Sequence, residues 1–215
     1  MAEMFSRWLA AVQAYASADD PQSDIAAKVA LVIVSNQPFY PLYLHAIVGT
    51  AAWPAWLTLL TAPLFASAPM LARRNPFAGR ALMVLTGTVN TVFSVKLLGA
   101  QSGVELFLLP CALLGAVLFR PAERLMSLPL LGLPFVSYLL IDPCLGEPLM
   151  KVADSNFASL VAINATSVGA LTALIGILAA ARMAAQQARL VPAQDFDAQI
   201  GPGAPPLRRR CHIWS

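Results

Sequence analysis

Charged residues are scarce in this sequence. Only 12% of its 215 residues are Asp, Glu, Lys or Arg, whereas 58% are hydrophobic and the mean hydropathy is +0.68. A soluble domain carries about 25% charged residues, so this composition excludes a cytosolic globular domain. It also excludes disorder, which requires low hydrophobicity and high charge. The apolar residues occur in long blocks, which predict an all-α, polytopic membrane helix bundle.

Residues that carry catalysis or bind metals are equally scarce. The three cysteines form no CxxC pair, so neither a zinc site nor a disulfide framework is indicated. GxSxG, HExxH, P-loop and GxGxxG motifs are absent, and we therefore expect no enzymatic activity, no cofactor and no metal. Of the two histidines only His45 lies in an apolar block, which excludes a bis-histidine haem site within one chain. No basic patch with interleaved aromatic residues exists, so nucleic acid is not an expected partner.

By composition the chain divides into three segments. Residues 1–18 carry an apolar stripe that predicts an amphipathic helix on the membrane surface; a frayed terminus or a helix packed on a missing partner is the alternative. The stripe consists of Met4, Phe5, Trp8, Leu9 and Val12. Residues 19–190 hold the transmembrane helices, and Asp20 with Pro21 forms a helix start. Residues 191–215 are rich in proline and glycine, and Pro192 should stop a helix, so we expect a disordered cytoplasmic tail.

About six transmembrane helices are predicted within residues 19–190. The predicted spans are residues 30–49, 53–71, 78–98, 104–119, 125–141 and 157–181. A span needs roughly 17–25 apolar residues, and the fourth and fifth are at the short end of this range. For those two a re-entrant hairpin is the competing assignment, which leaves both ends of the chain on the same side.

The orientation follows from the distribution of lysine and arginine, which accumulate on the cytoplasmic side. With both termini cytoplasmic, Lys96 and Lys151 are the only two of the 14 basic residues outside. The inner residues are Arg7, Lys28, Arg73, Arg74, Arg80, Arg120, Arg124, Arg182, Arg189, Arg208, Arg209 and Arg210. We therefore expect a multi-pass protein of a bacterial inner membrane, with the lipid bilayer as its main partner.

A few polar residues inside or beside the apolar blocks are candidates for ligand binding. Lys96 and Glu105 flank a short turn and are predicted to lie close together, because charges at membrane depth tend to pair or to line a cavity. Alternatively Lys96 extends outward to the interface and Glu105 remains there. Asn90 and His45 complete the candidate set, although an interhelical hydrogen bond and interfacial packing are the simpler interpretations of these two.

The sixth predicted span carries small residues at alternating spacings of four and three. These residues are Ala162, Thr166, Gly169, Ala173, Gly176 and Ala180. Such a seam allows two helix backbones to approach closely in lipid. It predicts the closest helix contact within the bundle, and the interface of a homodimer is the alternative.

The order of these features resembles the six-span N-terminal input module of bacterial class III adenylate cyclases and sensor histidine kinases. The resemblance rests on residues 19–21, residues 103–110, the basic turn at residues 120–124 and the last span running into a cytoplasmic helix. It implies a non-catalytic sensor-input function that passes a membrane or ligand signal to a cytoplasmic signalling protein, here without an output domain. A small carrier or permease is the alternative, because prolines in the first two spans are typical of discontinuous helices.

Overall fold

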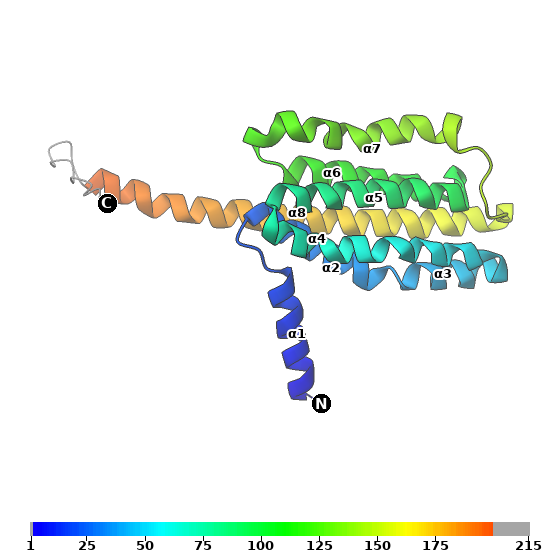
Figure 1. The fold of residues 1–215 in the computed structure, drawn as a ribbon, viewed down its shortest axis with the longest axis horizontal. Coiled ribbons are helices and arrows are strands. Elements are labelled where there is room, and N and C mark those ends of the chain that lie inside the picture. Colours follow the sequence, from blue (N-terminus) through cyan, green and yellow to red (C-terminus); the bar gives the residue numbers. More distant parts are fainter. Residues whose placement is uncertain (1, 200–215) are drawn as a thin grey trace. The chain divides into compact units, whose positions relative to one another are not determined.

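The computed structural model describes residues 2–199, and every regular element in that range is helical (Figure 1). This confirms the predicted all-α bundle. The elements are α1 (Ala2–Ala16), α2 (Pro21–Asn36), α3 (Phe39–Val48), the 3₁₀ helix η1 (Gly49–Thr61), α4 (Ala62–Arg74), α5 (Pro76–Leu98), the 3₁₀ helices η2 (Ala100–Ser102) and η3 (Val104–Phe107), α6 (Leu108–Leu118), the 3₁₀ helix η4 (Pro121–Glu123), α7 (Arg124–Leu145) and α8 (Asp154–Gln199).

Four stretches of this helical chain are long and apolar enough to cross a membrane. They are Pro21–Arg74, Pro76–Leu98, Leu125–Leu145 and Asp154–Ala188, and Val104–Leu118 is a shorter apolar helix. The first stretch is not one rod, because α2 packs beside α4 and α3 packs beside η1. It is therefore a hairpin of two legs, and each of the six predicted spans corresponds to a helical leg of the bundle (Figure 1).

Two helices of the bundle begin with the same local chemistry. The Asp20 carboxylate accepts a 2.9 Å hydrogen bond from the backbone N–H of Ser23, and Pro21 occupies the first turn of α2. The Asn75 carboxamide likewise accepts a 3.1 Å bond from Ala78 N at the start of α5, where Pro76 follows it. A side-chain oxygen satisfies a free N–H of the first turn, and proline supplies the helical φ without needing a partner. The predicted helix start at Asp20 is thus confirmed.

The core consists of two apolar clusters at different heights of the bundle. One lies towards the end that carries Asp20, Arg73, Arg80 and Arg120, which we call the basic end; it is built around Phe65, Met83, Val84, Leu114, Leu118 and Ile175. The other lies towards the opposite end and is built around Leu44, Val95, Leu97, Leu98, Val104 and Leu160. Helices α5, α6 and α8 contribute to both clusters, so they connect the two heights of the bundle.

The closest glycine contact in the described residues is between α4 and α5, not on α8. A Cβ added to Gly79 would lie 2.5 Å from Ala72 Cα, whereas one added to Gly169 or Gly176 would meet nothing within 4 Å. All six seam residues of α8 are exposed. The prediction that this seam makes the closest contact inside the bundle is therefore wrong. The buried side of α8 instead includes larger side chains, such as Leu160 and Ile175.

Both ends of the described chain are helical. Helix α1 forms as predicted, and of its stripe Met4 is exposed and Val12 half-buried; the side chains of Phe5, Trp8 and Leu9 lie outside the described part. Residues 180–199 belong to a second unit, whose described part is the continuation of α8. The expected disorder from residue 191 is thus wrong as far as residue 199, because Pro192 costs the helix one N–H donor without ending it. The remaining tail lies outside the described residues.

Candidate functional site

The helix break between α2 and α3 creates a polar position inside the bundle. Pro38 has no N–H group, so it cannot continue the hydrogen-bond ladder of α2, which ends at Asn36. Helix α3 begins at Phe39, and Gln37 is left between the two helices. The side chain of Gln37 points into the bundle and is only 7% exposed. A buried amide therefore lies within a stretch that is otherwise suited to crossing a membrane.

The Gln37 amide joins three segments of the fold. Its Nε2 donates to the Thr58 carbonyl oxygen at 3.1 Å and to Thr61 Oγ1 at 2.7 Å, both on η1. Thr61 Oγ1 also lies 2.8 Å from Asn90 Oδ1 on α5. A backbone carbonyl can only accept, so the nitrogen of the amide must face Thr58. Gln37 Oε1 then points elsewhere, and it has no partner among residues 2–199.

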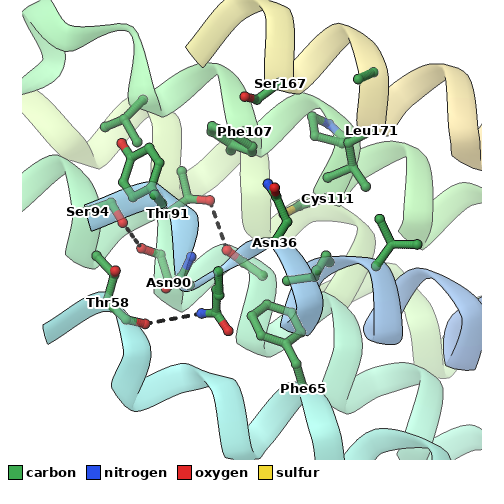
Figure 2. Close-up of a pocket in the computed structure, with 18 of the residues that line it drawn as sticks. Asn36, Thr58, Phe65, Asn90, Thr91, Ser94, Phe107, Cys111, Ser167 and Leu171 are labelled. Carbon is green, nitrogen blue, oxygen red and sulfur yellow. Dashed lines mark hydrogen bonds between the residues drawn. The ribbon is translucent and has the colours of Figure 1, made fainter. Parts of the chain in front are cut away.

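A cavity of about 670 Å³ lies beside this amide. Figure 2 shows side chains that line it. Helices from α2 to α6 and α8 contribute to its wall, and Phe65, Met83 and Leu114 close it towards the basic end. Its polar lining includes Asn36, Asn90, Thr91, Ser94, Cys111 and Ser167. All of these side chains are neutral, and within residues 2–199 no Asp, Glu, Lys, Arg or His lines the cavity. Such a mixture of apolar walls and a few polar groups is typical of small-molecule sites.

The position of α8 makes room for this cavity. Helix α8 packs less closely against the other helices than α4 packs against α5. Asn164 of α8, which is 1% exposed, accepts a 3.2 Å bond from Tyr40 Oη and donates a 2.9 Å bond to the Ser102 carbonyl oxygen. These bonds hold α8 to α3 and η2 on the side of the cavity away from the basic end. Ser167 and Leu171 follow on α8 and form part of the wall (Figure 2).

Only one of the four predicted ligand-binding residues lines this cavity. Asn90 does so, whereas His45 is exposed in the last turn of α3. Lys96 Nζ donates at 2.7 Å to the carbonyl oxygens of both Leu145 and Glu147. The predicted ion pair between Lys96 and Glu105 does not form, because carbonyl oxygens at the end of α7 and just after it bind the ammonium group instead.

Several residues of the site were missed by sequence reasoning. Gln37 directly precedes Pro38 within an apolar run, and this pair is the sequence signal for a helix break with a polar side chain. Thr58, Thr61 and Ser167 carry no comparable signal, because hydroxyl residues in apolar helices often bond their own backbone. Thr58 Oγ1 does so here, donating to the Ala55 carbonyl oxygen at 2.7 Å.

A buried network of charges ties the helix termini together at the basic end. Arg80 is 1% exposed, and its guanidinium donates to both carboxylate oxygens of Glu123 at 2.7 and 3.0 Å and to the Leu118 carbonyl oxygen at 2.7 Å. Asp20 lies 3.7 Å from Arg80 and also binds Arg120. Two positive and two negative side chains thus compensate one another, so this network is structural rather than an open binding site.

The carboxyl groups of this network are stabilised in their charged form. Burial by itself raises the pKa of Asp20, but hydrogen bonds from Ser23 and the charges of Arg80 and Arg120 outweigh it. Its pKa therefore lies below the ordinary 3.8. Burial likewise raises the pKa of Glu123, and the hydrogen bonds and charges of Arg80 and Arg120 bring it below the ordinary 4.5. Both groups are ionised at neutral pH.

No protein-family model, curated protein or solved structure matches this chain. Within residues 2–199 no group of three His, Cys, Asp or Glu side chains is placed to hold a metal ion. The cavity beside Gln37 is therefore the candidate functional site on its geometry alone.

Proposed function

We propose that this chain is a membrane-embedded, non-catalytic ligand-binding module of sensor-input type. A small molecule occupies the cavity beside Gln37, and its presence is passed along α8 to a signalling protein in the cytoplasm. The observation that carries the proposal is the double role of α8. It supplies Ser167 and Leu171 to the cavity wall, and the same helix continues to Gln199. A molecule that presses on the wall presses on the helix that continues along the chain into residues 180–199.

The topology in this proposal has both termini in the cytoplasm of a bacterial inner membrane. The basic residues support it, since Arg73, Arg80 and Arg120 gather at one end of the bundle and Lys96 lies towards the other. Trp53 and Trp56 are exposed on η1, where indole rings suit the opposite interface. Reporter fusions at Asn75 and Ala122 should report cytoplasm and one at Gly146 should not. A periplasmic signal at Asn75 would refute this orientation.

The transmission step is tested with a thiol on the cytoplasmic part of α8. Cys111, Cys144 and Cys211 are first replaced, and Ala184→Cys is introduced into the full chain in proteoliposomes. Adding a long-chain alcohol as the probe should change the alkylation rate of this cysteine. The matched control is the same probe on a variant in which Ala170→Trp fills the cavity edge. An equal rate with and without the probe contradicts transmission along α8.

A small carrier is the second candidate, and the helix breaks support it. The α2–α3 break and the 13-residue 3₁₀ helix η1 lie at the cavity, and discontinuous helices of this kind surround the substrate sites of many transporters. A carrier must expose its cavity to water on alternating sides. Ser167→Cys, as the sole cysteine, should react with a membrane-impermeant maleimide in a carrier and should stay unreactive in a sensor module. Leu149→Cys, on an exposed loop, is the positive control.

A further inference from the structure

The cavity opens sideways, between α2 and α8. Among its lining residues, Ser35 and Asn36 on α2 and Thr166 and Ala170 on α8 are exposed, whereas those on α5 are buried or half-buried. Apolar side chains surround this opening and are also exposed, namely Val32 at 44%, Phe39 at 50% and Tyr43 at 49%. Exposed apolar residues around a mouth fit a lipid environment better than water.

The depth of this opening places it within the hydrocarbon region. Asn36 lies 15 residues after Pro21, which is about 22 Å along a helix that starts at the basic end. Thr166 lies 12 residues after Asp154, or about 18 Å from the opposite end. The hydrocarbon core of a bilayer is about 30 Å thick, so both edges of the opening lie inside it and not at either surface. A molecule that enters here comes from the bilayer.

The charge of the lining restricts the chemistry of that molecule. Among residues 2–199 no Asp, Glu, Lys, Arg or His lines the cavity, so a charged ligand would be buried at low dielectric without a counter-ion. An uncharged ligand carries no such cost. Its apolar part can contact Phe65, Met83 and Leu114, which form the closed end.

The unpartnered oxygen of Gln37 restricts the chemistry further. Gln37 is 93% buried, lines the cavity, and has its Nε2 already engaged by Thr58 and Thr61. Its Oε1 can only accept, and a buried acceptor without a donor is costly. We infer that the cavity takes an uncharged, hydroxyl-bearing amphiphile from the bilayer, which enters between α2 and α8 and donates a hydrogen bond to Gln37 Oε1. This inference rests on the proposed function, because it names the ligand of the same site.

The test compares two matched photoactivatable probes on the full chain in phosphatidylcholine proteoliposomes. One is a long-chain alcohol with a diazirine on the chain, and the other is its methyl ether, which is larger by one methyl group and has no hydroxyl donor. The alcohol should label cavity residues about tenfold more than the ether does, because one buried hydrogen bond is at stake. Unlabelled alcohol should compete. Equal labelling by the two probes, or no saturable labelling in the cavity, overturns the inference.

Two pairs of variants test the residues involved. Gln37→Met removes the acceptor at similar volume and should reduce alcohol labelling to the level of the ether. Asn36→Met removes an amide from the mouth and should leave the preference intact. Ala170→Trp should reduce labelling by narrowing the mouth, whereas Ala165→Trp, on an exposed position outside the lining, should not. Unchanged labelling in Ala170→Trp refutes lateral entry. If Gln37→Met does not fold, the comparison of alcohol and ether on the unmodified chain still tests whether the ligand needs a hydroxyl group.

Failure of this inference is distinguishable from failure of the proposed function. Alcohol labelling that depends on Gln37, without a change at Ala184→Cys, supports the ligand class and refutes transmission along α8. A change at Ala184→Cys that the ether produces as well as the alcohol supports transmission and refutes the role of the hydroxyl group.

Discussion

Helices α5 and α8 both contain glycine, and their glycines lie in different surroundings. On α5, Gly79 faces Ala72 of α4 so closely that a Cβ would lie 2.5 Å from the Ala72 Cα atom, and the next residue, Arg80, is buried. On α8, Gly169 and Gly176 belong to a regular seam, yet a Cβ on either would meet nothing within 4 Å. The regular pattern is exposed and the isolated glycine is buried. Small residues permit close approach, and the position of the partner decides whether it occurs.

The largest effect should come from breaking the charge network beside Gly79. Glu123→Ala leaves the Arg80 guanidinium buried without its two-oxygen partner, which should lower the free energy of unfolding by about 3–5 kcal/mol. Chemical unfolding in detergent micelles measures this loss. Glu147→Ala, on an exposed side chain, is the control and should change stability by less than about 0.5 kcal/mol. A similar stability for both variants would show that Arg80 does not need Glu123.

The second largest loss of stability should come from disturbing the close contact between α4 and α5. Gly79→Leu should push α4 and α5 apart and destabilise the bundle by about 1–3 kcal/mol through overpacking. Gly132→Leu on α7 is the matched control, since a Cβ there would meet nothing within 4 Å. Thermal unfolding of both variants in the same detergent makes the comparison. If Gly132→Leu were as destabilising as Gly79→Leu, helix propensity or lipid contact rather than crowding would explain the loss.

A smaller loss of stability should appear when the pH is lowered. The pKa values of Asp20 and Glu123 lie below their ordinary values of 3.8 and 4.5, so the folded state binds protons less readily than the unfolded state. Their contribution is present above these ordinary values and is lost as the pH falls through the lowered folded pKa values. Unfolding midpoints measured from neutral to acid pH should therefore decrease. Glu123→Gln should reduce the slope of the unfolding midpoint against pH. An unchanged slope in this variant would exclude Glu123 as a source of the pH dependence.

The smallest effect is expected on α8. Gly176→Leu and Gly169→Leu should alter the stability of the monomer by less than about 0.5 kcal/mol, because both positions are exposed and uncrowded. Thermal unfolding, with the oligomeric state measured in parallel, checks this. A stability loss as large as that of Gly79→Leu would show that the seam packs inside the bundle. A dimer abolished by either substitution would instead identify a second copy as the partner of the seam.

The site could be predicted only in part, and particular residues show why. Asn90 was recognisable as a polar residue within an apolar helix, and it does line the cavity. Lys96 and Glu105 were expected to pair because they flank one turn, but the carbonyl oxygens of Leu145 and Glu147, about 50 residues away, bind Lys96 instead. Proximity along the chain predicts a contact poorly when a distant helix end supplies free acceptors.

Composition by itself determined that this protein is a bundle of apolar helices, because a chain with 12% charged residues has too little polar surface for a soluble fold. Local signals also determined the helix starts at Asp20 and Pro21, since a cap and its first turn involve only neighbouring residues. The tertiary structure decided the rest. It placed Gly79 against Ala72, left the α8 seam exposed, and put Gln37 beside a cavity. These outcomes depend on which helix faces which, and apolar faces that are chemically alike do not encode their partners in any short stretch of sequence.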